Sequence, residues 1–349
     1  MHNEAGEKRP LWHTAVRKRP ARAVLAALAM LLATASCWAT PAEESPRVVA
    51  SIPPIHSLVA GVMQGVAAPS LIVRGYGSPH TYRMRPSDAA RLHGADLVFW
   101  VGSTLETFLE KPLSSLPESA RVVPLMETAG LTLLENRQGG PWGHHGAHSH
   151  QHGHAYGAAD TDGASTTSRD WRRYNPHIWL DPENARQLLG AMARHLAEVD
   201  PAHAARYRIN AEALSRRVEE LADQIEEQLS GLGSIPYLVF HDAYPYLEAR
   251  YGLRAAGSVT TNPGKLPSVR RIADLRATVA RLNIRCIFRE PQFDAGFVET
   301  TLGDKKVTIG VLDPLGIGEE PGPELWFRIM QTHARVIGDC LSSARPKPE

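Results

Sequence analysis

The sequence has little of several features that usually identify a function. No stretch of 18 apolar residues follows the N-terminal region, so no membrane-spanning helix is expected there. Charge of one sign is not in excess, with 38 Lys and Arg against 37 Asp and Glu in 349 residues. No HExxH pattern occurs, and the cysteines have no partner at CxxC spacing, so the familiar local zinc motifs are missing.

The N-terminus predicts export. Basic residues lie at positions 17–22, and an uncharged apolar stretch follows at 23–35, which is typical of a signal peptide and too short to cross a bilayer. We expect residues 1–39 to be removed after Ala39, with lipid attachment at Cys37 as the alternative. The signal peptide predicts a periplasmic location. The remainder carries 32 Lys and Arg against 35 Asp and Glu, which argues against nucleic acid as a partner.

Cysteine is scarce, and its use agrees with export. Cys37 lies in the signal segment, which leaves Cys286 and Cys340 as an even pair in an oxidising compartment. A bridge between them would close a loop whose chain entropy is worth about 4 kcal/mol. Two unrelated buried thiols are the alternative.

Histidine, in contrast, is concentrated in one short stretch. Six histidines lie within eleven residues and are surrounded by Gly, Ser and Gln: His144, His145, His148, His150, His152 and His154. Imidazole is the most common protein ligand of zinc, copper and nickel. The span 139–169 is therefore predicted to be a metal-collecting loop, weaker in affinity than a built site, with a solvated low-complexity insert as the alternative.

The pattern of apolar runs predicts an α/β protein with two lobes, each built on a mostly parallel sheet. The first lobe, 47–199, has expected strands at 48–52, 71–73, 97–101 and 122–123, and expected helices at 55–63 and 85–93. The second lobe, 232–345, has expected strands at 237–240, 286–288 and 307–312, and expected helices at 242–251, 266–282 and 324–341.

A long helix is expected between the lobes, at 200–231. Asp200 and Pro201 form a start signal, and Gly231 is a stop signal. Apolar residues recur between them at helical spacing: Leu214, Val218, Leu221, Ile225 and Leu229. We expect a strut packed against both lobes, with an ordinary amphipathic helix on one lobe as the alternative.

Three histidines outside the loop lie where ligands of open α/β sheets collect, beyond the carboxyl ends of strands. His80 follows one expected strand and His241 another, while His177 lies in a third loop. Each of them taken singly is more often a hydrogen-bonded loop residue than a metal ligand. Asp242, next to His241, is expected to cap the following helix.

Six segments in order carry a resemblance to a known family. They are SIPPIHSLV at 51–59, PHTY and RPSD at 79–88, NPHIWLDP at 175–182, FHDAY at 240–244, EPQF at 290–293 and LDPLG at 312–316. Together they resemble the zinc-uptake solute-binding proteins of bacterial ABC transporters, over residues 47–343. The resemblance implies two α/β lobes joined by a long rigid helix. It also implies a monomer that is not an enzyme and that delivers Zn²⁺ to an inner-membrane permease with a cytoplasmic ATPase.

The resemblance also implies a ligand set. The family's metal ligands fall on His80, His177 and His241, with Asp313 or a water as the fourth, and its disulfide falls on Cys286 and Cys340. Manganese-carrying relatives typically have glutamate at the third position, so a histidine there favours zinc. A carrier of manganese or another divalent metal, a zinc-dependent hydrolase and a plain metal buffer are the alternatives.

Overall fold

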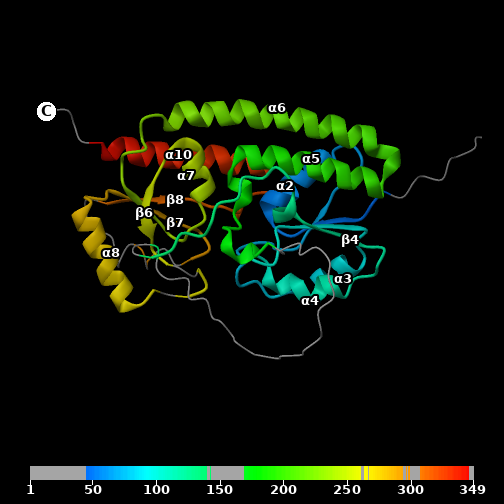
Figure 1. Ribbon diagram of the computed structural model, residues 1–349, viewed down its shortest axis with the longest axis horizontal. Helices are drawn as coiled ribbons and strands as arrows, with labels where there is room; N and C mark the ends of the chain where they lie inside the picture. The colour runs from blue at the N-terminus through cyan, green and yellow to red at the C-terminus, as the bar shows by residue number, and fades with distance from the viewer. Residues whose placement is uncertain are drawn as a thin grey trace, which may run out of the picture. The chain divides into compact units, whose positions relative to one another are not determined.

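The computed structural model describes residues 45–139, 142, 169–260, 263–265, 267–293, 296, 298 and 307–345 (Figure 1). The predicted signal peptide and the six loop histidines lie outside these ranges. Within them, no helix has both the length and the apolar character needed to cross a bilayer.

The first lobe is built on a four-stranded sheet. Its strands are β1 (Val48–Ala50), β2 (Ser70–Leu71), β3 (Leu97–Trp100) and β4 (Arg121–Pro124), in the order β2-β1-β3-β4, and every pair is parallel. The helices of this part of the chain are α2 (Pro53–Val62), α3 (Pro86–His93) and α4 (Glu110–Ser114). β1 and β3 are buried along their whole length, which explains their continuous apolar runs.

The second lobe repeats this arrangement. Strands β5 (Tyr237–Val239), β6 (Ala255–Ser258), β7 (Cys286–Arg289) and β8 (Thr308–Val311) form a parallel sheet in the order β6-β5-β7-β8. Helices α7 (Pro245–Tyr251) and α8 (Val269–Arg281) belong to it. The predicted fold class, two α/β lobes with parallel sheets, is therefore confirmed.

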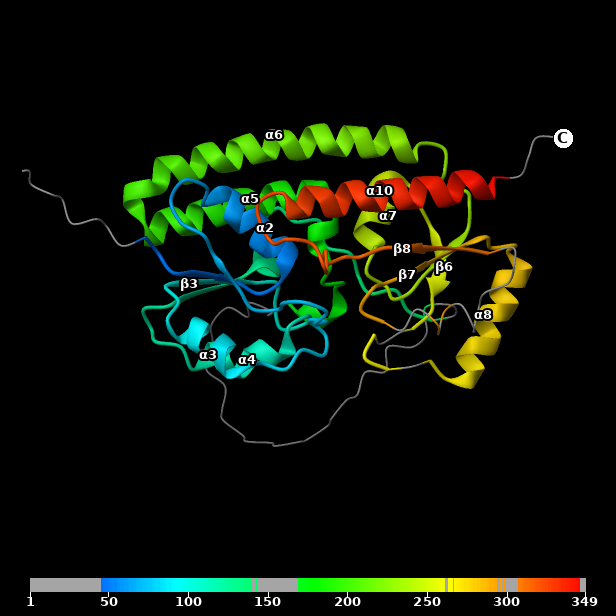
Figure 2. The ribbon, with the colours of Figure 1, turned by 180° about the vertical axis from the view of Figure 1, so that it is seen from behind.

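One long helix extends past both lobes (Figures 1 and 2). Helix α6 (Ala204–Leu229) has 26 residues and a length of about 39 Å. It packs on α2 and α5 (Pro182–Val199) on one side of the molecule, and on α7 and α10 (Leu325–Ala344) on the other. Its five predicted core residues are all buried. The expected strut is thus present, and α10, which also contacts α2, adds a second connection.

Hydrogen bonds from two buried indole rings to backbone carbonyls join the two lobes beneath these helices. The indole N–H of Trp179 donates to the Pro314 carbonyl at 2.8 Å, and that of Trp326 donates to the Trp179 carbonyl at 2.9 Å. Both rings are fully buried. The two lobes therefore share one packed core beneath α6 and α10, which limits how far they can move apart.

Cys286 of β7 and Cys340 of α10 form a disulfide, with their Cα atoms 6.0 Å apart. The predicted bridge is confirmed, and it fastens α10 to the second sheet.

Of two expected helix starts, the one at Asp242 is wrong, and the one at Asp200 is right in position but has no side-chain cap. Helix α7 begins at Pro245 rather than at Asp242, and the Asp242 carboxylate binds the Arg137 guanidinium instead of capping it. Asp200 precedes a short 3-10 turn, Pro201–His203, and its carboxylate accepts a hydrogen bond from the Tyr207 hydroxyl at 2.6 Å. In both cases a nearby side-chain donor competes successfully with the backbone N–H groups for the carboxylate.

Candidate metal centre

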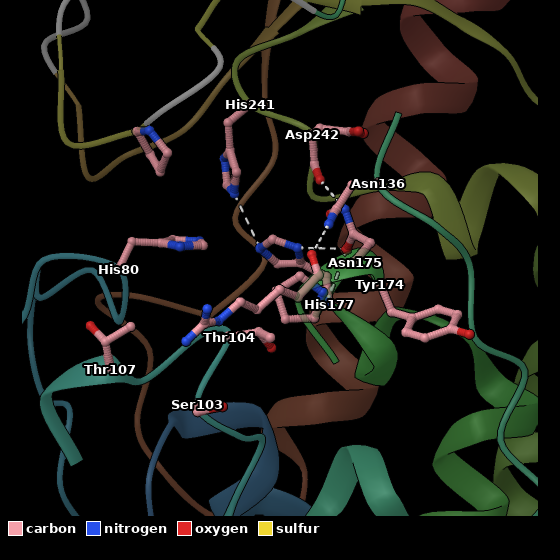
Figure 3. Close-up of a pocket in the computed structure, with 13 residues that line it drawn as sticks. His80, Ser103, Thr104, Thr107, Asn136, Tyr174, Asn175, His177, His241 and Asp242 are labelled. Atoms are coloured by element: carbon pink, nitrogen blue, oxygen red, sulfur yellow. Dashed lines mark hydrogen bonds between the residues drawn. The ribbon is translucent and has the colours of Figure 1, made fainter. Parts of the chain in front are cut away.

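Three imidazole rings from distant parts of the chain point toward one another between the lobes (Figure 3). His80 lies in the loop after β2, His177 in the turn before the 3-10 helix Ile178–Leu180, and His241 just after β5. One ring nitrogen from each lies within 4.8 Å of the other two. No other group of three or more possible metal ligands occurs among the residues that the structure describes.

The sheet topology accounts for the position of His241. β5 has β6 on one side and β7 on the other, so the connection from β5 to β6 and the connection from β6 to β7 run in opposite directions along the sheet. A crevice opens at the carboxyl end of β5, where this direction changes. His241 follows β5, and Glu290 follows β7 directly. Because neighbouring parallel strands end at the same sheet edge, the two side chains meet although 49 residues separate them.

Two of the histidines are held in a defined orientation. The Nδ1 of His241 is 2.5 Å from Glu290 Oε1, and the Nδ1 of His177 is 2.9 Å from Asn175 Oδ1. Carboxylate and amide oxygens accept hydrogen bonds, so each Nδ1 donates one, and Nε2 is the nitrogen that each ring, when neutral, offers to a metal. The side-chain amide nitrogen of Asn175 donates to the Asp242 carbonyl at 2.7 Å, which supports this orientation of the amide.

The two Nε2 atoms face each other at 3.2 Å. At that distance either one nitrogen carries a proton that it donates to the other, or a metal ion between them offsets the repulsion of the two lone pairs. Two nitrogens bound to one zinc ion at about 2.05 Å, with a tetrahedral angle, would be about 3.3 Å apart. The spacing of His177 and His241 thus matches what a small tetrahedral metal ion requires.

His80 completes the triangle. Its ring centroid is 5.4 Å from that of His177 and 5.5 Å from that of His241, and its Nε2 has no hydrogen-bond partner among the described residues. Desolvation and, to a smaller extent, the neighbouring His241 together lower the pKa of His80 to about 3. Desolvation, with repulsion from His241 and His80, also places the pKa of His177 well below its usual value. Both rings are therefore neutral, as metal binding requires.

A cavity of about 390 Å³ leads to the three rings. Its walls are mainly polar and include Ser103, Thr104, Asn136, Arg172 and Tyr174. The opposite side of the rings faces a void of only about 10 Å³, lined in part by Trp179, Phe293 and Leu315. One side of the rings therefore faces an open polar cavity, through which a hydrated ion could enter, and the other side is closed and apolar.

Asp313 was expected, as the alternative to a water, to supply the fourth ligand, and in the structure its carboxylate makes hydrogen bonds of its own. Oδ1 accepts the Leu315 N–H at 3.0 Å, and Oδ2 accepts the Ile317 N–H, so the side chain closes the turn after β8. Desolvation raises its pKa to about 6. The described ligand group within 4.8 Å contains the three histidines and not Asp313.

Sequence reasoning missed the residues that orient the ligands. Glu290 and Asn175 appeared there only as members of recognised segments, and Arg137 was given no role. Glu290 and Asn175 do stand in two of the recognised segments, EPQF and NPHIWLDP, but nothing local indicates their partners. No signal pointed to Arg137.

Comparison with known proteins agrees with this geometry. The family model for zinc-uptake complex component A, periplasmic, matches residues 48–340. The high-affinity zinc uptake system protein ZnuA of Brucella suis biovar 1 (strain 1330) is 41% identical over 321 residues, which cover 88% of this chain and 95% of that protein.

Solved structures share the fold. A crystal structure of ZnuA superimposes with a TM-score of 0.67 at 22% identity, covering 85% of this chain and all of that one. The solute-binding protein FpvC of Pseudomonas aeruginosa, in complex with Mn²⁺, gives 0.69 at 21% identity, over 86% of this chain and all of that one. The extent of the family match and the identity to the Brucella protein show that the chain belongs to the family of periplasmic component A proteins of zinc-uptake complexes.

Proposed function

We propose that this protein captures Zn²⁺ in the periplasm with His80, His177 and His241. It would then deliver the ion to an inner-membrane ABC permease driven by a cytoplasmic ATPase. The observation that carries the proposal is the convergence of three imidazoles, two of which present Nε2 lone pairs at a spacing suited to one tetrahedral ion. Family membership supports the transport role.

The chemistry of the donors favours zinc over manganese. Three neutral nitrogen ligands suit a borderline cation such as Zn²⁺, whereas Mn²⁺ prefers oxygen. The Mn²⁺ complex of FpvC shows that a protein of this fold can hold that ion, but it shares only 21% of its sequence with this chain. We therefore assign the preference from the ligand set rather than from the fold.

For the fourth position we propose a water molecule rather than Asp313. Both Asp313 oxygens accept backbone N–H groups, from Leu315 and Ile317. A hydrogen bond to a charged group contributes about 1.5–3 kcal/mol, so rotating this carboxylate toward the metal would lose several kcal/mol. The polar cavity beside the rings supplies room for water.

The geometry argues against a zinc-dependent hydrolase. Such an enzyme needs a free base beside the metal-bound water. Glu290, the carboxylate next to the rings, is bonded to the Nδ1 of His241, on the far side of that ring from the Nε2 that would bind metal. The family, moreover, is one of metal-uptake binding proteins and not of enzymes.

The histidines of the 139–169 segment would bind zinc more weakly and raise its concentration near the cleft. We propose that the protein is a monomer, because a carrier must bring its cleft to the permease. A plain metal buffer would bind the same ion without a transporter.

Zinc titration of the mature protein tests the ligand set. Competition against a fluorescent chelator should find one tight site per chain, and His241→Ala should weaken it by about 100-fold or more because one of three protein ligands is lost. Little change would remove His241 from the set. Transport is tested separately: cells that depend on this protein should fail to accumulate zinc when His241→Ala replaces it, and unchanged uptake would support a buffer.

A further inference from the structure

Arg137 makes a group of contacts close to the metal centre that nothing above explains. Its guanidinium binds the Asp242 carboxylate through both Nε and Nη2, with Nε 2.9 Å from Oδ1. Nη1 donates to Glu248 Oε2 at 2.7 Å. The guanidinium carbon also lies 3.6 Å from the centroid of the Trp142 ring. One side chain is thus held by two carboxylates and an aromatic face.

The two carboxylates are largely shielded from solvent. Side-chain exposure is 10% for Asp242 and 4% for Glu248. Burial opposes the charge on Arg137, but the two carboxylates raise its pKa above the usual value, so the guanidinium stays charged. Removing the guanidinium would leave two carboxylates of like charge together in a largely buried site, which is strongly unfavourable.

Both partners belong to the second lobe, whereas Arg137 follows β4 of the first in the chain. Asp242 directly follows His241 in the chain, so the backbone position of Asp242 helps to determine the position of the His241 ring. The Asp242 carbonyl accepts the Asn175 amide, and the oxygen of that same amide fixes the Nδ1 of His177. Contacts of one residue, Asp242, therefore reach both histidines whose Nε2 atoms face each other at 3.2 Å.

We propose that Arg137 is a positioning residue for the metal centre: by holding Asp242 from the opposite lobe, it sets the spacing between the His177 and His241 nitrogens. The inference rests on the proposed ligand set. Arg137 touches no metal ligand side chain itself, and it acts through the backbone of residues 241–242 and through Asn175. Because the spacing it holds suits a small tetrahedral ion, its loss should harm Zn²⁺ binding more than binding of the larger Cd²⁺.

Arg137→Gln removes the charge and the bidentate pair. Residues that orient metal ligands typically contribute about 10–100-fold in affinity, so we expect the variant to bind Zn²⁺ at least about tenfold more weakly. The Zn²⁺ to Cd²⁺ affinity ratio should fall as well. Arg137→Lys keeps a cation near both carboxylates and should recover part of the loss.

Arg217→Gln is the matched control. Both Nη atoms of Arg217 donate to the Glu324 carboxylate, at 2.9 and 2.6 Å, and its guanidinium carbon lies 4.2 Å from the centroid of the Phe327 ring. It links α6 to the residue before α10, away from the three histidines. We expect its zinc affinity to stay within about twofold of the wild type.

Chelator competition with Zn²⁺ and with Cd²⁺, at a temperature where each apo variant is folded, decides the matter. The proposal is overturned if Arg137→Gln loses less than about tenfold in Zn²⁺ affinity, or if it loses Zn²⁺ and Cd²⁺ affinity equally, since a general loss of stability would do the latter. If Arg137→Gln does not fold, Asp242→Asn is measured against the same thresholds. Failure of the wild-type protein to bind zinc would instead refute the proposed function.

Discussion

Glu290 offers the most direct test of how this centre obtains its affinity. Its carboxylate is 2.5 Å from the Nδ1 of His241, and the residue is 1% exposed. It is therefore shielded from bulk solvent. A buried carboxylate behind a ligand imidazole fixes the tautomer and increases the electron density that the Nε2 offers to the metal.

Two substitutions separate these effects. Glu290→Gln keeps an accepting oxygen, so the ring should keep its orientation while the negative charge is lost. Glu290→Ala loses both. With outer partners contributing about 10–100-fold in affinity, we expect about tenfold weaker zinc binding for Glu290→Gln and about 100-fold for Glu290→Ala. These losses correspond to about 1.4 and 2.7 kcal/mol of binding free energy.

Chelator competition at neutral pH measures these losses, and thermal unfolding of the zinc-free variants checks that each is folded. Glu324→Gln is the control, because its carboxylate also binds a basic side chain but is half exposed on the surface. If Glu290→Gln is folded and binds zinc as tightly as the wild type, the carboxylate contributes only to the fold and the reasoning fails.

Three further predictions concern other parts of the molecule. Deleting residues 143–157 should abolish weak zinc binding and leave the tight site intact; loss of the tight site would show that the loop supplies a primary ligand. Reducing the Cys286–Cys340 bridge should lower the free energy of unfolding by up to about 4 kcal/mol in denaturant titrations, and an unchanged midpoint would contradict this. Burial lowers the pKa of His333 to about 4 and desolvation that of His80 to about 3. Below pH 6.5 the unfolded chain then binds more protons than the folded one. The free energy of unfolding of the zinc-free protein should therefore fall between pH 6.5 and 4, by up to about 1.4 kcal/mol per pH unit for each ring. A free energy of unfolding that does not change over this pH range would refute these pKa values.

The secondary structure of the chain could be predicted where local signals are strong. The repeat of apolar residues from Leu214 to Leu229 predicted α6, because one buried face is a property of the helix itself. Helix α5 was overlooked although Asp181 and Pro182 form a good start signal, with the Asp181 side chain accepting the Glu183 N–H at 3.1 Å. Strand β6 has no strong local signal: it contains alanine and glycine and exists because it pairs with β5.

The sequence by itself determined which donors are available, since three histidines in three loops, together with the order of the surrounding segments, already indicate a borderline metal ion. Only the tertiary structure decided how they are held. The contacts of Glu290 with His241 and of Arg137 with Asp242 join residues 49 and 105 positions apart, and the Asp313 carboxylate accepts hydrogen bonds from its own turn. Such contacts depend on which strand ends meet at a sheet edge and on which lobe faces which, and local patterns carry no information about either.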